Sequence, residues 1–581
     1  MSAAAAMAFV ASGDRLLTIG SPPSPFSEDR LVTAKIAGDP DAISTSARTT
    51  PGEGPIGGYE AYKSATRTYP ANVIPPSMVQ NAKKTFNKIA AQSVSNSKDS
   101  SSGNNHWVSY GPIQNSIQPG LLSFSGATNT TASRDTALVI APTCVPGNCR
   151  LWVGTAGGGV WRTNDALAAD PSWTWLTGVL ALNSVGALVA DPNDSSGNTL
   201  YVGTGEGNRC SSGCEAGVGI YKTTDGGNSW TKLPDTCVSN TTYSCANSGD
   251  AFLGRGINQI VVDPTNSQHL FVGSALGVRG LSHTVGVGTT ESQRFEPGAD
   301  EPGLYESTDG GKTFTEVWDG TKPTAGLSFG TTDVGLDPLD PSVVYVSAFD
   351  AGVWRRDAGA AQTAFSRVFA PQFPGNGQDR TMFALTVKNN HTRIYLTDGT
   401  ANGGGISAAN ASNFWRTDNG NQPAAALLAS QTAGATPPPD TTTYPQTYSG
   451  WQLLTSKTTG SPYFATDDFC TGQCWYDEDV YTPVGLPDTV YVIGSNEYGE
   501  QPCNTNGVGC GNGRSNGREV LYSTTAGDPD SAASMRTFTD LSYDATINHP
   551  PWCAYLPYFD NGCVNAPNGI HPDQHAIVVN P

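Results

Sequence analysis

Short apolar runs recur along most of the chain in the pattern of a repeated β-module. Each repeat opens with an alternating strand that ends in Asp-Pro or a similar pair. A second β-rich run follows, and a third comes after a Gly-rich loop. The clearest openings are VGALVADP (185–192), INQIVVDP (257–264) and DVGLDP (333–338). No helical period separates these strands, which excludes a fold of alternating strands and helices.

The spacing of the repeats predicts an all-β propeller. The landmarks Asp191, Asp263 and Asp337 are 72 and 74 residues apart, so the loops of each blade are extended. Further repeats open at TALVIAP (136–142), MFALTV (382–387) and DVYTPVGLP (479–487), and QHAIVVNP (574–581) opens a seventh. Either HWVSYGP (106–112) and GLLSFSG (120–126) complete this seventh blade, or the chain is cut short there.

A tight turn occurs twice in nearly the same form, in GVGIYKTTDGGNSW (217–230) and GLYESTDGGKTF (303–314). The carboxylates of Asp225 and Asp309 can bind turn N–H groups, and the Gly pairs supply positive φ. Trp230 and Phe314 then fold back into an apolar layer. These turns resemble the Asp-box (BNR-repeat) pattern. The chain is therefore similar to the sialidase-like Asp-box β-propeller superfamily, of the large secreted bacterial type, which implies the fold and not the chemistry.

Residues 1–104 form a leader or pro-segment, and 105–581 form the propeller. One short helix is predicted at 77–92, where Met78, Ala82, Phe86 and Ile89 share a face. The opening MSAAAAMAFVAS lacks a basic n-region and is at best a remnant of a secretory signal.

The cysteines and the net charge indicate an oxidising compartment. All twelve cysteines fall into close pairs, which predicts loop-clamping disulfides rather than zinc sites. The pairs are Cys144 with Cys149, Cys210 with Cys214, Cys237 with Cys245, Cys470 with Cys474, Cys503 with Cys510, and Cys553 with Cys563. The protein is expected to be secreted, extracellular or periplasmic. A net charge of −19 argues against nucleic acid as a partner, and no run of 18 apolar residues could span a membrane.

Alignment of the innermost strands predicts a substrate-binding rim. Arg134, Arg255 and Arg380 fall at comparable positions, where three guanidinium groups could bind a carboxylate, and Glu206 lies in a loop between second and third strands. In the alternative interpretation these arginines pair with Asp135, Asp379 or Asp479 and hold neighbouring blades together.

The resemblance to sialidases implies a set of catalytic residues. In that family an arginine triad binds a carboxylate, a tyrosine primed by a glutamate attacks the sugar, and an aspartate is the acid/base. Here SRDTAL (133–138) shares only its Arg and Leu with the family's opening motif. Glu478 and Tyr481 would be the base and the nucleophile, and Asp135 is a further catalytic candidate.

Two acidic or histidine-rich segments are candidates for catalysis or metal binding. In HPDQHA (571–576), His571, Asp573 and His575 alternate and would share one side of a strand. With Asp477 or Asp479 they could bind a divalent metal or act as general acid/base, or His575 could be a structural histidine. YDEDVY (476–481) is either a solvated turn or an oxygen site for Ca²⁺. No cofactor is required.

Three functions follow from these residues. The first is a sialidase-like glycoside hydrolase acting on an extracellular polysaccharide or glycoconjugate. The second is a non-catalytic propeller that binds a glycan or protein, and the third is a structural or assembly role. The sequence contains no Gly-x-Ser-x-Gly, His-Glu-x-x-His or phosphate-binding Gly-Lys motif, so serine hydrolases, zincins and NTPases lack support.

Overall fold

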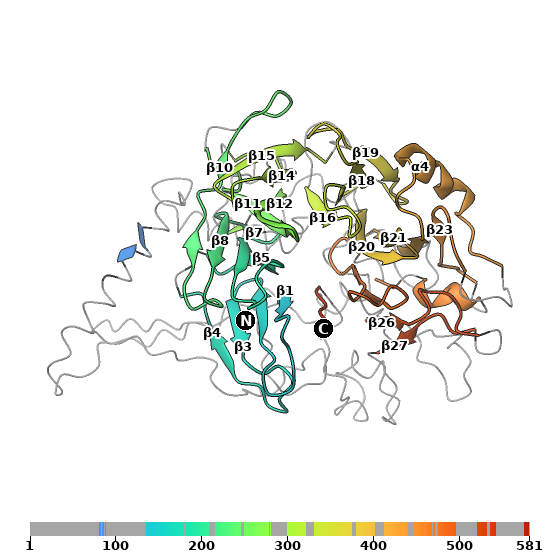
Figure 1. Cartoon of the computed structure of the whole chain (residues 1–581), viewed down its shortest axis with the longest axis horizontal. Coiled ribbons are helices and arrows are strands. Elements are labelled where there is room, and N and C mark those ends of the chain that lie inside the picture. Colours follow the sequence, from blue (N-terminus) through green and yellow to red (C-terminus); the bar gives the residue numbers. More distant parts are fainter. Residues whose placement is uncertain are drawn as a thin grey trace, which may run out of the picture. The chain divides into compact units, whose positions relative to one another are not determined.

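The computed structural model describes residues 81–82, 84–85, 88 and 135–579, with gaps in the last range at 179, 181, 208–214, 246–248, 278, 281–298, 321–329, 375–378, 401–411, 440–445, 459–460, 468, 471–473, 495–519, 532–534 and 542–574. All of these residues belong to the unit Ser44–Pro581. They form an all-β propeller (Figure 1).

Six antiparallel sheets make up the blades in chain order. Blade one contains β1 (Asp135–Ile140), β2 (Leu151–Thr155), β3 (Gly159–Thr163) and β4 (Trp173–Trp175). Blade two contains β5 (Val185–Ala190), β6 (Leu200–Thr204), β8 (Ile220–Thr223) and β9 (Thr231–Lys232). Blade three contains β11 (Arg255–Asp263), β12 (Asn266–Leu276), β14 (Leu304–Ser307), β15 (Thr313–Trp318) and, parallel to β15, β10 (Thr236–Cys237).

The second half repeats the same order. Blade four contains β16 (Thr331–Leu336), β17 (Val344–Ala348), β18 (Gly352–Arg356) and β19 (Ser366–Phe369). Blade five contains β20 (Arg380–Lys388), β21 (His391–Gly399), β22 (Ser412–Thr417) and β23 (Gln452–Leu453). Blade six contains β24 (Asp479–Tyr481), β25 (Val490–Ile493), β26 (Val520–Ser523) and β27 (Thr539–Asp540). A separate parallel pair joins β7 (Glu215–Ala216) to β13 (Arg279–Gly280).

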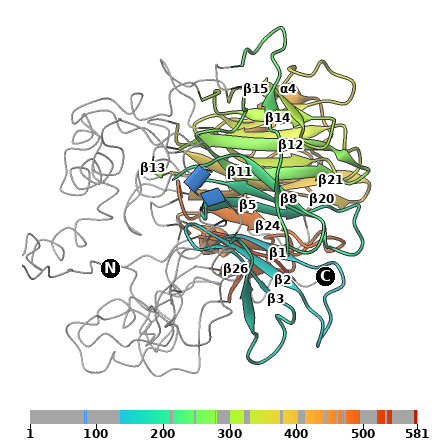
Figure 2. The ribbon, with the colours of Figure 1, turned by 90° about the vertical axis from the view of Figure 1, so that its left-hand side faces the viewer.

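The first strand of each blade is the innermost, and these strands contact one another in succession from β1 through β5, β11, β16 and β20 to β24. In Figure 2, β5 and β11 lie one above the other. The strand positions agree with the sequence prediction in all six repeats. The fourth, outer strands are short, at two to six residues.

The described residues form six blades, whereas the sequence predicts seven. His575–Val579, the first strand predicted for the seventh blade, carries no strand assignment within the described part of the chain. A strand needs a ladder partner on at least one side, and the segments expected to supply one, 106–112 and 120–126, lie outside the described residues. Figure 1 shows this C-terminal segment between β1 and blade six.

Apolar side chains fill the interfaces between neighbouring blades, because successive residues of a strand point to opposite faces. In blade two, Leu188 and Val202 pack against blade one, while Ala187 and Tyr201 pack against blade three. Blade two is therefore apolar on both faces, as a blade between two neighbours must be.

The repeated turn has the predicted hydrogen bonds. Asp309 Oδ1 accepts from the backbone N of Lys312 (3.0 Å) and of Thr313 (2.9 Å), and Thr313 Oγ1 donates to Oδ2 (2.7 Å). Gly310 and Gly311 have φ of 76° and 85°, in the left-handed region. Phe314 is fully buried, as its counterpart Trp230 nearly is.

Two short helices were not predicted. Helix α4 (Ala424–Ala433) follows Pro423 in the connection between the third and fourth strands of blade five, and packs its Leu427 on β19. A 3-10 helix, η4 (Pro462–Thr466), is capped by Ser461. Of the predicted helix at 77–92, only Asn81, Ala82, Lys84, Thr85 and Lys88 are described, and these are helical and exposed.

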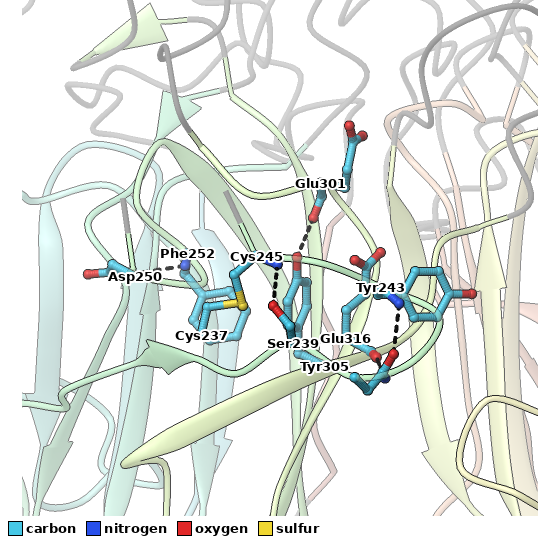
Figure 3. The surroundings of a disulfide bond; sticks show 10 residues. Cys237, Ser239, Tyr243, Cys245, Asp250, Phe252, Glu301, Tyr305 and Glu316 are labelled. Carbon is cyan, nitrogen blue, oxygen red and sulfur yellow. Dashed lines mark hydrogen bonds between the residues drawn. A yellow bond between two sulfur atoms is a disulfide. The ribbon is translucent and has the colours of Figure 1, made fainter. Parts of the chain in front are cut away.

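Three of the six predicted disulfides lie in the described residues and are confirmed: Cys144–Cys149, Cys237–Cys245 and Cys470–Cys474. Figure 3 shows that the second clamps a loop whose Ser239 Oγ accepts from the backbone N of Cys245 (2.9 Å).

The other three predicted disulfides stay predictions, because their cysteines lie outside the described residues. These are Cys210 with Cys214, Cys503 with Cys510, and Cys553 with Cys563.

None of the described helices is long and apolar enough to cross a membrane.

Candidate functional site

The innermost strands surround a cavity of about 200 Å³. All six blades supply its walls, together with the C-terminal segment. It is lined by Thr136, Ala137, Leu138, Gly186, Ala187, Leu188, Glu206, Gly207, Asn258, Gln259, Thr332, Arg380, Met382, Tyr476, Asp479, His575, Ala576 and Ile577. Four of the predicted site residues therefore meet in one cavity: Glu206, Arg380, Asp479 and His575.

Arg380 begins β20 and is held at the cavity by the residues before blade six. Its Nη1 donates to the backbone O of Tyr476 (2.8 Å), and its Nε lies 3.3 Å from Met382 Sδ. The guanidinium lies close enough to Asp333 and Asp479 for its positive charge to offset part of the rise that burial causes in the pKa of both carboxyl groups. Arg380 thus occupies the predicted rim position and also takes part in the alternative role, the linkage of neighbouring blades.

Two acids with raised pKa values, Asp333 and Asp479, lie near this arginine. Asp333 is buried and accepts from Gln259 Nε2 (3.1 Å) and from the backbone N of Phe383 (3.1 Å), which links blades three, four and five. Burial raises the pKa of Asp333 to about 6 despite these bonds. Burial, together with the charge of Asp333, raises the pKa of Asp479 to about 7. Asp479 therefore titrates near neutral pH in the wall of the cavity.

His575 enters the cavity from the C-terminal segment. Its ring meets that of Tyr476 edge-on at 4.4 Å between centroids, and its Nε2 lies 3.6 Å from Oδ1 of the buried Asp477. The predicted proximity of His575 to Asp477 is therefore observed. His571 and Asp573, the other members of the predicted cluster, lie outside the described residues.

Glu206 reaches the cavity at the end of β6. Its backbone pairs with Glu215 through two hydrogen bonds of 2.9 and 2.8 Å, which hold the loop against the innermost strands. The side chain is buried among the cavity-lining residues. Glu206 therefore lies at the cavity, as predicted from its place in the loop between the second and third strands of blade two.

The predicted three-arginine fork is not assembled from the described residues. Arg255 is buried away from the cavity wall, where Nη2 faces the backbone O of Ala299 (3.4 Å) and Nε donates to that of Asp300. This arginine holds a loop of blade three. Arg134 lies outside the described residues, and Asp135 is exposed at the start of β1, outside the cavity lining.

Glu478 and Tyr481 do not come together as a base and nucleophile. They lie three residues apart and point to opposite sides, because alternate residues of an extended segment share a face. Glu478 is buried beside Asp398 of blade five, and burial raises its pKa well above the usual range. Tyr481 instead lies beside Tyr491 (6.4 Å between centroids) on the other face of blade six.

A cluster of buried acids lies behind the cavity and includes Asp350, Asp379, Asp398 and Glu478. Asp350 Oδ1 accepts from the backbone N of Asp379 (3.1 Å), and Asp398 Oδ1 accepts from Thr381 Oγ1 (2.8 Å). Burial raises the pKa of Asp398 to about 7 and that of Asp379 well above its usual range. The interaction between the two carboxyl groups, after burial, also raises the pKa of Asp379. Asp350 follows the second strand of blade four by two residues, and Asp398 is the last residue but one of the second strand of blade five. These positions at the ends of second strands are the sequence feature by which the two acids could be recognised.

The run YDEDVY is not a solvated turn. Asp477 and Glu478 are buried and Asp479 is half-buried. Within the described residues, two groups have the spacing of metal ligands: Cys237 and Cys245 with Asp300, and Cys470 and Cys474 with Glu478. Both cysteine pairs are disulfide-bonded, so neither offers a thiolate. Asp477 and Asp479 belong to neither group.

Comparison with known proteins identifies no family for the chain. No family model and no curated protein matches the chain. Among solved structures, the chain is similar to an ancestral GH74 enzyme, with 15% identity and a TM-score of 0.37 over 62% of this chain. It spans about a third of that protein, 35%. It is also similar to YCF48 from Cyanidioschyzon merolae, with 12% identity and a TM-score of 0.25, over 50% of this chain and 84% of that one.

Proposed function

We propose that the protein is a secreted glycan-active enzyme that hydrolyses glycosidic bonds at the axial cavity. Its substrate is an extracellular polysaccharide or glycoconjugate. Asp479 protonates the leaving-group oxygen, and the carboxylate of Glu206 stabilises or attacks the opposite face of the sugar. Water supplies the hydroxyl that replaces the leaving group, and its proton returns to the enzyme.

The observation that carries this proposal is the presence of two carboxyl groups in one cavity, with one of them titrating near neutral pH. An acid with a pKa of about 7 can donate a proton where an ordinary aspartate is already ionised. Arg380 supplies a fixed positive charge beside it, and Gln259 and Asn258 add amide groups to the lining. Such polar groups fix the orientation of a sugar ring.

The residues expected from the sialidase pattern have other roles in this proposal. Glu478 and Tyr481 face away from each other, and Arg255 is bound within blade three. The proposal therefore rests on Asp479, Glu206 and Arg380, and does not require the tyrosine nucleophile. His575 remains a candidate acid/base beside Asp477.

The experiment is a screen for released reducing sugars over a panel of polysaccharides and glycoconjugates. Asp479→Asn and Glu206→Gln should each lower turnover by about 10²-fold or more while the melting temperature stays close to that of the wild type. Asp340→Asn, which removes an exposed carboxylate in a turn after β16, serves as the matched control and should retain full turnover. If no glycan in the panel is cleaved by the wild type, the enzyme hypothesis fails.

The second candidate is a non-catalytic propeller that binds a glycan or a protein. The observation in its favour is that the predicted base and nucleophile are not brought together. Glycan binding by the wild type, without turnover and with retained binding in Asp479→Asn, would establish this alternative. Ca²⁺ remains a proposed ligand of the carboxylate oxygens of Asp477 and Asp479, and calorimetric titration with Ca²⁺ tests it.

Secretion is supported by the three disulfides, which persist in oxidising compartments. We place the domain boundary near residue 104, with the leader before it and the propeller after it. Limited proteolysis should cut between 95 and 105 and leave a protected fragment.

A further inference from the structure

Blade one has an apolar face that no described blade covers. In register across its strands, Leu138 pairs with Val153, Val153 with Trp161, and Trp161 with Trp175. Trp161 and Trp175 are 37% and 45% exposed, and Trp173 on the same face is 42% exposed. The opposite face, which includes Trp152 and Val160, is buried against blade two. We call the three exposed side chains, Trp161, Trp173 and Trp175, the blade-one face.

In the following blades the same register position packs against the preceding blade, and in blade four its occupant, Trp354, is half-buried there. The counterpart of Trp161 in blade two, Tyr221, is 6% exposed and packs against blade one. Tyr305 of blade three and Trp415 of blade five are fully buried by the blade that precedes each of them. The exposure of Trp161 therefore marks a position where a preceding blade is expected, since large exposed apolar patches on soluble proteins usually contact something.

Blade six shows the complementary feature. Tyr481, Tyr491 and Tyr522 pair in one row across three strands, with ring centroids 6.4 and 4.9 Å apart. All three are only half-buried. The aromatic residues at the position of Tyr491 in the other blades, such as Tyr201 and Tyr345, are fully buried by the next blade. We call this row the blade-six face.

The path of the chain indicates what lies between the two faces. From β15 to β16, from β19 to β20 and from β23 to β24, the chain passes from the outer strand of one blade to the innermost strand of the next. The same rule predicts that the residues leading into β1 belong to the outer strands of a blade that precedes blade one. His575–Ile577 already lines the cavity beside β1 and β24, at the innermost position of that blade.

We propose that residues 106–134 of this chain dock as strands between the blade-six face and the blade-one face. This segment precedes β1 directly, and its 29 residues are enough for two or three strands of the length found in the other blades. Its apolar residues are concentrated in HWVSYGP (106–112) and GLLSFSG (120–126), which supply aromatic and aliphatic side chains for both faces. The docked segment would then hold the C-terminal segment, and His575 with it, in the cavity wall.

Oxidation of tryptophan in the full chain tests this proposal. Protection of Trp161, Trp173 and Trp175 by at least tenfold relative to a free tryptophan is expected, as measured residue by residue by mass spectrometry after N-bromosuccinimide treatment. Leu122→Asp with Phe124→Asp in the full chain should remove that protection, whereas Phe86→Asp in the leader should not. Trp152, Trp415 and Trp451 are fully or almost fully buried, and their continued protection shows that the variant is folded.

A second measurement keeps the test decisive if the double variant does not fold. p-Benzoylphenylalanine placed at Trp175 of the otherwise unmodified chain should crosslink to residues 106–134 of the same molecule. Crosslinks to a second copy, with protection that rises with protein concentration, would assign the faces to a dimer and overturn the proposal. Free reactivity of the three tryptophans in the unmodified chain, without crosslinks, would overturn it too.

Discussion

Arg416 of blade five and Asp528 of blade six form an ion pair of 3.0 Å in which both side chains are fully buried. Asp528 also accepts from Tyr448 Oη (2.9 Å), and Arg416 Nη2 donates to the backbone O of Gln446 (2.8 Å). Both oxygens of the Asp528 carboxylate are therefore used. The pair links two blades at a turn that corresponds to the Asp-Gly-Gly turns of blades two and three.

Asp528→Ala should destabilise the protein by about 3–5 kcal/mol, because it removes one of the two buried carboxylates, with Asp418, that balance the Arg416 guanidinium, and also the acceptor of Tyr448 Oη. Chemical denaturation monitored by circular dichroism measures the change. Asp530→Ala removes a neighbouring acid whose partner, Arg536, is 56% exposed. This control should cost less than about 1 kcal/mol. Equal losses of unfolding free energy in the two variants would show that burial does not determine how much each ion pair stabilises the protein.

Asp309→Ala should cost about 1–3 kcal/mol, because it removes the acceptor for the turn N–H groups of Lys312 and Thr313. The axial cavity is formed by other residues, so glycan turnover at a temperature well below unfolding should be unchanged. The exposed neighbour Thr308→Ala is the matched control. A loss of turnover in Asp309→Ala without loss of stability would show that this turn contributes to the site.

Stability should fall as the pH rises through the folded-state pKa of His269. The imidazole lies between Glu306 (2.8 Å) and Asp263 (2.9 Å), and Arg356 also binds Glu306. The hydrogen bond to Glu306, and next that to Asp263, raises the pKa of His269 above its usual 6.5. Because the folded-state pKa of His269 is raised, the stabilisation that protonated His269 gives to the folded state is complete below pH 6.5. It is lost as the pH rises above the folded-state pKa.

The melting temperature of wild type should therefore decrease from pH 6 to pH 9, and His269→Gln should reduce that decrease. Part of the slope should remain in the variant. Asp398 and Asp379 also have raised pKa values, and a buried acid that keeps its proton loses stability as the pH rises above its unfolded value of about 4. A variant with an unchanged slope would show that His269 is neutral in the folded protein.

Glycan turnover should decrease as the pH rises through about 7, because Asp479 must be protonated to donate to the leaving group. The measurement is kcat/KM against pH for a substrate identified in the panel. Asp333→Asn removes a negative charge that helps to raise the pKa of Asp479. The decrease of kcat/KM on the alkaline side of the pH profile should therefore move to lower pH. If this decrease stays in place, a group other than Asp479 controls it.

Replacement of Cys144 and Cys149 by Ser should cost about 2 kcal/mol, the value expected for a bridge that closes a loop of five residues. Denaturation of the double variant beside the wild type measures this cost.

Non-reducing peptide mapping of the wild type should find all six local disulfides. The three that the structure leaves untested are the bridges from Cys210 to Cys214, from Cys503 to Cys510, and from Cys553 to Cys563. Each closes a short loop rich in Gly, Asn, Pro or Ser, which favours a local partner over a distant one. A free thiol at Cys214, Cys510 or Cys563, or a bridge between two of these loops, would contradict the predicted pairing.

The sequence was sufficient for the strands and turns of six blades. Alternation of apolar residues sets which strand faces are buried, and the Asp-Gly-Gly turn depends on hydrogen bonds within five residues, as around Asp309. These features are local, so they can be inferred without knowledge of neighbours. The helix α4 was missed because its ten residues, AAALLASQTA, lie in a long connection, and Leu427 is its only buried apolar side chain.

The site depended on the tertiary structure. The sequence placed Glu206, Arg380, Asp479 and His575 near a common axis, but it could not separate them from Arg255 and Glu478, which have equivalent positions along their blades. Whether such a side chain enters the cavity depends on contacts far away in the chain: Arg380 binds the backbone of Tyr476, 96 positions on, whereas Arg255 binds that of Asp300, 45 positions on. The sequence by itself therefore determined the repeated β-module, and only the packing of one module on the next decided which acids and arginines share the cavity.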